Sequence, residues 1–251
     1  MITCFYNGQD VLFNSEQERF LVKGGLIAKM LVPGISFDGK NQQTVDIKSV
    51  FSSSGLHKLV ELVDTPYLLL YLQDLPLSIS EQALQRFVSV MKNTGAGLIY
   101  SNYQIEESGN FKKHPVIDYQ TGSIRDDFDF GPVLFFDMNK LRFVLQKSHQ
   151  DYQFSGLFDA RLKISEEYKI IRIPEYLYSI GTKHQKQTSE KHFDYVDPKN
   201  RSVQTEMEKA ATEHLKRTGA YLTPEFTRPD IKKGNFPVEA SVIIPVKNSE
   251  K

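Results

Sequence analysis

Short apolar runs that stop at turn-forming residues mark the first part of the chain. The run at 2–6 and the run at 25–32 each end in such a signal, which is typical of a buried strand. The continuous run at 67–72 has the pattern of a strand buried on both faces of a parallel sheet. The polar stretch 36–43 predicts a loop. Further strands are predicted at 97–100, at 133–136, at 240–246, and as a pair of short strands at 170–173 and 176–180 on either side of Pro174.

Between these runs, apolar residues recur every three or four positions and predict amphipathic helices. The clearest helix follows Ser80 and closes at Gly95. Another covers 203–217 and ends at Gly219, with an apolar side made of Met207, Ala210, Ala211 and Leu215. Helices are also predicted at 56–63, 138–146 and 156–165. The alternation of strand and helix predicts an α/β sheet layered by helices.

Composition narrows the kinds of protein that this chain can be. Its 251 residues suffice for one large domain or two small ones, and 31 basic residues balance 31 acidic ones. A neutral chain has no field that favours nucleic acid. Cys4 is the single cysteine, and no apolar run approaches the ~20 residues of a membrane span. The start also lacks the layout of a signal peptide, so we expect a soluble cytoplasmic protein that reaches a membrane only through partners.

Two passages resemble family 2 glycosyltransferases. The first is Tyr-Leu-Leu-Leu-Tyr-Leu-Gln-Asp at 67–74, with its following helix and then Gly-Leu-Ile-Tyr-Ser-Asn-Tyr at 97–103. In that family a buried strand delivers an Asp-x-Asp cluster to the sheet edge, and the next strand ends in a Tyr-Ser-Asp-Tyr-like turn. The second passage comprises 128–136, 155–163 and 173–178, and is similar to the acceptor half of the family. Together they cover roughly residues 50 to 180 in the family's order.

The resemblance implies a fold, an activity and a cofactor. The fold is GT-A-like, a mostly parallel sheet flanked by helices, followed here by a C-terminal helix and an extended tail. The activity is sugar transfer from a nucleotide sugar to a glycan or lipid-linked acceptor, as in polysaccharide biosynthesis. Open parallel sheets bind such ligands at the carboxyl ends of their strands. A divalent cation, Mg²⁺ or Mn²⁺, would neutralise the departing diphosphate, and a carboxylate would take the acceptor's proton.

Four residues are candidates for binding the donor. Asp74 ends a predicted strand at the family's acidic cluster, so the resemblance implies a metal ligand or a ribose contact; the alternative is a turn former. Tyr6 and Asn7 follow the first strand, where a nucleotide base would stack, although a core tyrosine is the common alternative. Asn102 stands where the family often has an aspartate.

Three carboxylates are candidates for catalysis. Asp127 and Asp129 belong to an acidic stretch beside two phenylalanines, which can face a sugar or form a solvated acidic turn. Asp159 aligns with the helix that follows the family's catalytic base; it is expected to be catalytic or to hold a neighbouring loop.

The sequence also departs from the family at its acidic motifs. Leu72 occupies the place of the first aspartate, and Gly156-Leu157 occupies the place of the family's Glu-Asp pair. A second hypothesis is therefore a non-catalytic module that binds a glycan or partner, or braces an active domain. A third is a nucleotidyltransferase, which needs a Gly-rich phosphate loop that the segment 7–10 supports poorly.

Three segments are expected along the chain. Residues 1–182 form the glycosyltransferase-like domain, and 183–235 form a polar loop, a helix and a Pro-rich linker. The end, 236–251, resembles the opening strand of another family 2 domain. This implies a second glycosyltransferase domain C-terminal to a partly degenerate first copy. The alternative is an ordinary final strand that packs on its own domain.

Overall fold

Five ranges of the chain are described by the computed structural model: residues 1–6, 26–34, 42–147, 150–182 and 200–226. The chain divides into two units, Met1–Ala220 and Tyr221–Lys251, and every described helix and strand belongs to the first. The predicted strand at 240–246 and the polar loop after residue 182 fall outside the described residues. The predicted segments 183–235 and 236–251 remain predictions, although the helix within the first of them is described. None of the described helices is long and apolar enough to cross a membrane.

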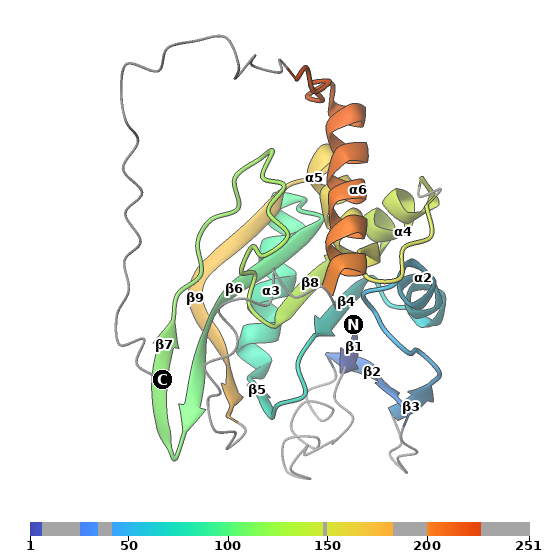
Figure 1. Cartoon of the computed structure of the whole chain (residues 1–251). Helices are drawn as coiled ribbons and strands as arrows, with labels where there is room; N and C mark the ends of the chain where they lie inside the picture. The colour runs from blue at the N-terminus through green and yellow to red at the C-terminus, as the bar shows by residue number, and fades with distance from the viewer. Residues whose placement is uncertain (7–25, 35–41, 148–149, 183–199, 227–251) are drawn as a thin grey trace, which may run out of the picture. The chain divides into compact units, whose positions relative to one another are not determined.

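A nine-stranded sheet organises the first unit (Figure 1). Its strands are β1 (Ile2–Tyr6), β2 (Ile27–Pro33), β3 (Gln42–Val45), β4 (Tyr67–Tyr71), β5 (Leu77–Ile79), β6 (Leu98–Glu107), β7 (Asn110–His114), β8 (Val133–Asp137) and β9 (Ile170–Gly181). Their order is β3-β2-β1-β4-β8-β6-β9-β5, with β7 paired to β6. Strands β3, β2, β1, β4, β6 and β9 run in one direction, and β8, β5 and β7 run against them. The predicted α/β sheet is confirmed, with β8 inserted antiparallel between β4 and β6.

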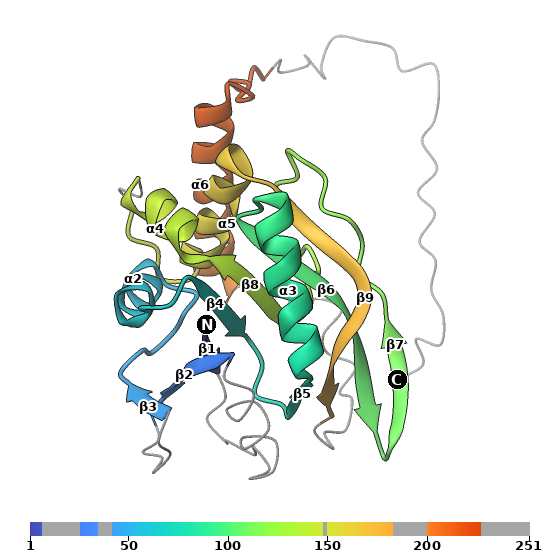
Figure 2. The same ribbon diagram turned by 180° about the vertical axis from the view of Figure 1, so that it is seen from behind.

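Strand β8 shows how the two faces of the sheet are covered. On one face, Phe135 packs against Phe87 with ring centroids 5.4 Å apart. Phe87 belongs to α3 (Glu81–Thr94), which Figure 2 shows in front of the sheet. On the other face, Leu134 and Phe136 line a pocket together with residues of α5 (Gly156–Glu167). Successive strand residues point to opposite faces, so one short apolar run serves both helix layers.

The helices begin and end largely where their caps predict. Ser80 Oγ accepts a hydrogen bond from the backbone of Ala83 at the start of α3, and Gly95 ends the helix in the left-handed region. The remaining helices are α2 (Ser53–Leu62), α4 (Met138–Gln146) and α6 (Arg201–Thr218), and α6 ends at Gly219 in the same conformation. All five predicted helices are thus present.

The predicted pair of short strands around Pro174 is wrong, because 170–181 is one strand, β9, parallel to β6. Register along the pair jumps from Ser101 opposite Ile173 to Asn102 opposite Tyr176. Proline has no N–H to donate, and a bulge is where a ladder tolerates it. The proline therefore marks an irregularity within one strand.

Helix α6 packs against α5 as part of the same unit as the sheet. Ala210 is fully buried in a small cluster with Tyr152, Phe158 and Leu162, as the apolar pattern predicted for Ala210. The other deeply buried residue of this helix is His214, which the pattern did not single out.

Candidate functional site

A pocket of about 330 Å³ opens where the carboxyl end of β4 meets β8, β6, α5 and α6. Residues of β6, β8, α5 and α6, the two residues after β4, and neighbouring loops line it: Phe51, Leu72, Gln73, Leu98, Tyr103, Asp126, Phe128, Asp129, Phe130, Gly131, Pro132, Leu134, Phe136, Phe154, Leu157, Phe158, Arg161 and Met207. We call this cavity the aromatic pocket, because phenylalanine is the commonest residue in its lining. It lies at a strand carboxyl end, where open α/β sheets bind their ligands.

The loop that precedes β8 forms one wall of the aromatic pocket. Phe128 and Phe130 lie with ring centroids 4.5 Å apart, and both rings meet Tyr100 of β6 edge-on. Such edge-to-face contacts stabilise a loop beyond the area that they bury. The loop is therefore anchored on the sheet.

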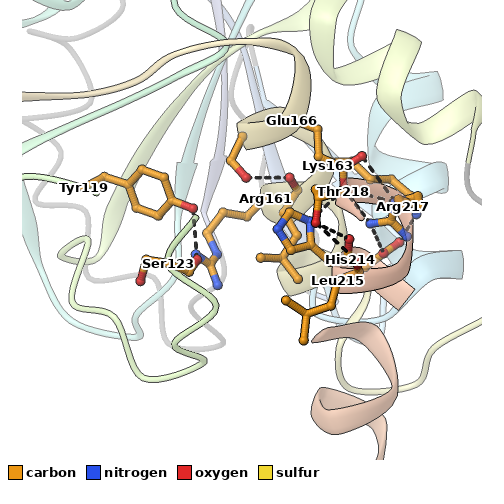
Figure 3. Close-up of polar contacts among 12 residues, drawn as sticks. Tyr119, Ser123, Arg161, Lys163, Glu166, His214, Leu215, Arg217 and Thr218 are labelled. Atoms are coloured by element: carbon orange, nitrogen blue, oxygen red, sulfur yellow. Dashed lines mark hydrogen bonds and ion pairs between the residues drawn. The ribbon is translucent and has the colours of Figure 1, made fainter. Parts of the chain in front are cut away.

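Arg161 of α5 also holds the loop that precedes β8 (Figure 3). Its side chain is 6% exposed, and its guanidinium donates to the backbone oxygens of Ser123 at 3.4 Å and Arg125 at 2.9 Å. The guanidinium also lies 4.7 Å from the ring centroid of Phe158. Burial lowers the pKa of Arg161, but arginine stays protonated in proteins. Arg161 thus fixes the loop that carries the acidic residues.

The acidic stretch divides into residues that line the pocket and one that does not. Asp126 and Asp129 are lining residues. Asp129 accepts from the backbone N–H of Gly131 at 2.8 Å and lies 2.9 Å from His114 Nε2. Asp127 is outside the lining; the hydrogen bonds from Arg125 lower its pKa. The geometry therefore favours Asp129 over Asp127 as a group that meets a ligand.

Asp74 lies beside a layer of tyrosines at the carboxyl ends of β1 and β4. Tyr6 and Tyr71 both donate to the backbone oxygen of Leu75 at 2.8 Å, so they hold the turn that carries Asp74. Burial and then the charge of Asp74 raise the pKa of Tyr6 to about 12, and burial raises that of Tyr71 further. The Tyr6 ring is 1% exposed, and a core role fits this burial.

Asn102 and Asp159 are both buried and both serve neighbouring elements. Asn102 Oδ1 accepts from the backbone of Val116 at 3.1 Å and from Arg172 at 3.2 Å. Asp159, 2% exposed, pairs with Lys163 on its own helix and lies 3.9 Å from Arg217 of α6. Neither belongs to the lining of the aromatic pocket.

The contacts around Asp159 continue along the junction of α5 and α6. In Figure 3, Glu166 of α5 meets His214 and Arg217 of α6. Its carboxylate lies 2.7 Å from His214 Nδ1 and 2.8 Å from Arg217 Nη2. Burial raises the pKa of Glu166, but the hydrogen bonds from Arg217 and His214 outweigh it, and the net shift is downward. This network joins two helices, and none of Glu166, His214 and Arg217 belongs to the lining of the aromatic pocket.

Metal ligation has little protein support in the described ranges. They contain no group of three or more His, Cys, Asp or Glu residues placed to hold an ion. Asp74, the predicted metal ligand, is described and lies after the carboxyl end of β4. Asn7 lies outside the described residues.

The structure adds two pocket residues that the sequence did not suggest. Gln73 Oε1 is buried and has no hydrogen-bond partner among the described residues. Arg161 holds the acidic loop. A sequence signal existed for Arg161, an arginine flanked by apolar residues inside a helix; none distinguished Gln73.

Comparison with known proteins supports the fold. No family model and no curated protein matches the sequence. Among solved structures, the chain is similar to residues 1–349 of S. aureus TarS in complex with UDP-GlcNAc, with a TM-score of 0.52 and 9% identity over 88% of this chain and 72% of that chain. The UDP complex of TarS matches with a TM-score of 0.49 and 9% identity over 86% and 65%. The 2-C-methyl-D-erythritol 4-phosphate cytidylyltransferase of Francisella tularensis gives 0.39 and 10% identity over 78% and 97%.

The likeness to the UDP-GlcNAc complex concerns the fold alone, because so few residues are identical. The other two matches have TM-scores below 0.5 and carry no argument about this chain. The predicted fold class is confirmed: the chain has a GT-A-like α/β fold.

Proposed function

We propose that this chain is a glycosyltransferase that moves a sugar from a nucleotide-sugar donor to a glycan or lipid-linked acceptor. The observation that carries the proposal is the aromatic pocket, which adjoins Asp74 at the carboxyl end of β4 and contains Asp129. In this arrangement the donor lies over the ends of β1 and β4, and the acceptor enters the pocket. The family 2 likeness of the sequence and the GT-A-like fold support the same reading.

Asp74 is the residue that we assign to the diphosphate end of the donor. It follows β4 directly, on a turn held by two buried tyrosines. A single carboxylate together with substrate phosphates is a usual way to hold Mg²⁺. A bound divalent cation would neutralise charge on the leaving diphosphate. Tyr6 supports this site from the core through its hydrogen bond to Leu75. Asn7, which follows Tyr6 in sequence, and Asn102 remain predicted donor contacts.

Asp129 is the residue that we assign as catalytic base. The acceptor oxygen forms a bond to the anomeric carbon while the bond from that carbon to the diphosphate oxygen breaks, its electron pair leaving with the nucleoside diphosphate. The proton of the acceptor hydroxyl goes to Asp129, and His114 orients the carboxylate. The backbone N–H of Gly131 fixes its other oxygen. Asp159 stabilises the contact between α5 and α6.

The test is the release of nucleoside diphosphate by the full chain. Donors would be UDP-GlcNAc, UDP-glucose and their guanosine and thymidine counterparts, each with free and lipid-linked glycans. We expect acceptor-dependent release, lowered about 100-fold or more in kcat by Asp129→Asn. Asp127→Asn removes the same charge from the same loop outside the pocket, and we expect a much smaller loss. Equal losses in both variants would contradict the assignment of Asp129.

A second candidate is a non-catalytic nucleotide-sugar or glycan-binding module that braces another domain. The observation that favours it is the loss of acidic groups, with Leu72 in place of the first aspartate and Asp159 committed to Lys163. Binding of donor and glycan without any release of diphosphate would favour this candidate over transfer.

A further inference from the structure

The aromatic pocket contains polar side chains within apolar walls. One of them is Gln73, whose Oε1 is buried and accepts from no described residue. Solvent does not reach this oxygen, so the recognition of a ligand falls to the other polar groups of the lining.

Two polar groups in the lining are carboxylates with accepting capacity left. Asp126 accepts from the backbone N–H of Asp127 through Oδ1. Asp129 uses one oxygen for Gly131 and the other for His114. A carboxylate has about four lone-pair sites, so each of the two lining residues can accept further hydrogen bonds. A ligand rich in donors fits these groups.

The basic residue in the lining does not cancel the preference for a ligand rich in hydrogen-bond donors. Arg161 is the one lysine, arginine or histidine among the described residues that line the pocket. Its guanidinium donates to two backbone oxygens of the loop, and the rings of Phe158 and Phe130 lie 4.7 and 5.5 Å from it. Two of its five N–H donors are thus directed at the protein, and its charge offsets one of the two lining carboxylates, which leaves the described lining with an excess of negative charge.

Aromatic rings complete the site. Phe51, Phe128, Phe154 and Phe158 all contribute to the lining, and Phe51 and Phe154 are 40% and 38% exposed. The negative face of an aromatic ring attracts cations as well as apolar C–H groups. Rings and carboxylates act in the same direction on a positively charged sugar.

We propose that the aromatic pocket selects its sugar by charge: it binds a hexose with a protonated amine most tightly, a neutral hexose less tightly, and a hexuronate least. Asp126 and Asp129 supply the field that sets the order. The assignment rests on the proposed function only in calling this sugar the acceptor, since the binding itself needs no donor.

The test uses three ligands, the methyl glycosides of glucosamine, glucose and glucuronic acid, of which each charged one differs from glucose in a single substituent, at C2 or at C6. They are titrated by saturation-transfer NMR into the full chain at about pH 6, where an amine of this kind is protonated. We expect the amino sugar to bind about tenfold more tightly than glucose, and the uronate about tenfold more weakly. The double variant Asp126→Asn with Asp129→Asn should remove the order while the neutral sugar still binds. Asp127→Asn, outside the lining, should keep it.

Each outcome separates this proposal from the function proposed above. Equal affinities, or tightest binding of the uronate, overturn the selection by charge. No binding of any of the three sugars to a chain that binds UDP also overturns it and leaves the donor site standing. The expected order in a chain that binds no nucleotide supports the selection and overturns the transfer function.

Discussion

Glu206 joins α6 to the start of α5, and its removal tests how the wall of the aromatic pocket is held. Its Oε2 accepts from the backbone N–H groups of Phe154 at 2.7 Å and Ser155 at 3.2 Å, and its Oε1 from that of Gln153 at 3.1 Å. Ser155 is the N-cap of α5 and provides no side-chain cap of its own. The carboxylate of another helix therefore takes over part of the capping.

The expected cost of Glu206→Gln is about 2 kcal/mol. Hydrogen bonds to a charged group contribute roughly 1.5–3 kcal/mol and neutral ones about half as much. The amide keeps one accepting oxygen but turns an NH₂ group toward the remaining N–H donors, and partial exposure of the site lowers the total. For a unit of this size, a loss of about 2 kcal/mol lowers Tm by about 4–8 °C.

The pH dependence of this loss gives a second check. Burial raises the pKa of Glu206, but the three backbone N–H groups outweigh it, and the net shift is downward. A carboxylate whose folded pKa is lowered stabilises the fold above its unfolded pKa, and this stabilisation is lost as the pH falls through the folded pKa. The difference between wild type and Glu206→Gln should thus be full at pH 7 and shrink below the usual pKa of glutamate.

The assay is thermal unfolding followed by circular dichroism across this pH range. Glu208→Gln, an exposed substitution on the same helix, is the control and should change Tm little. A Glu206→Gln chain as stable as the control at pH 7 would refute the reasoning, as would a difference that grows on acidification.

Three further predictions concern packing around the site. Gly131→Ala should lower the free energy of unfolding in urea by about 2–4 kcal/mol, because the φ of Gly131 is +70° and the new Cβ would lie 2.6 Å from Tyr178 Oη. Gly122→Ala is the control: Gly122 has a φ of +88° but open space around it, so the loss should be about 1 kcal/mol. Burial raises the pKa of Cys4 to about 12, so iodoacetamide at pH 8 should label it only when the chain unfolds, as mass spectrometry would show. Arg161→Met should speed hydrogen exchange in the loop 120–131, since two loop oxygens lose their donor.

Much of the fold follows from signals that are local in sequence. Helix α3 has its cap at Ser80, its stop at Gly95 and an apolar stripe between them, so all the evidence lies within one segment. Strand β3 had no such signal: its polar residues Gln43 and Thr44 are exposed at the sheet edge, and part of it was predicted as loop. The continuity of β9 likewise depends on its neighbour β6, because the pairing with that distant strand determines whether Pro174 ends the strand or only interrupts its register.

The site was predictable in its parts but not in its assembly. The acidic stretch with Phe128 was recognised as a surface that could face a sugar, and Asp129 does line the pocket. The separation of Asp129 from Asp127 depends on Arg125 and His114, which sequence spacing does not resolve. The burial of His214 likewise required its partner on α5, 48 positions earlier.

The central claim is that a nucleotide sugar binds at the carboxyl end of β4. Calorimetric titration of the chain with uridine, guanosine and thymidine diphosphates and their sugars, with and without Mn²⁺, tests it most directly. We predict metal-dependent binding of at least one donor that Asp74→Ala abolishes and Asp64→Ala, a substitution before the amino end of the same strand, leaves intact. A folded chain that binds none of these ligands, or binds them equally well without Asp74, would contradict the account.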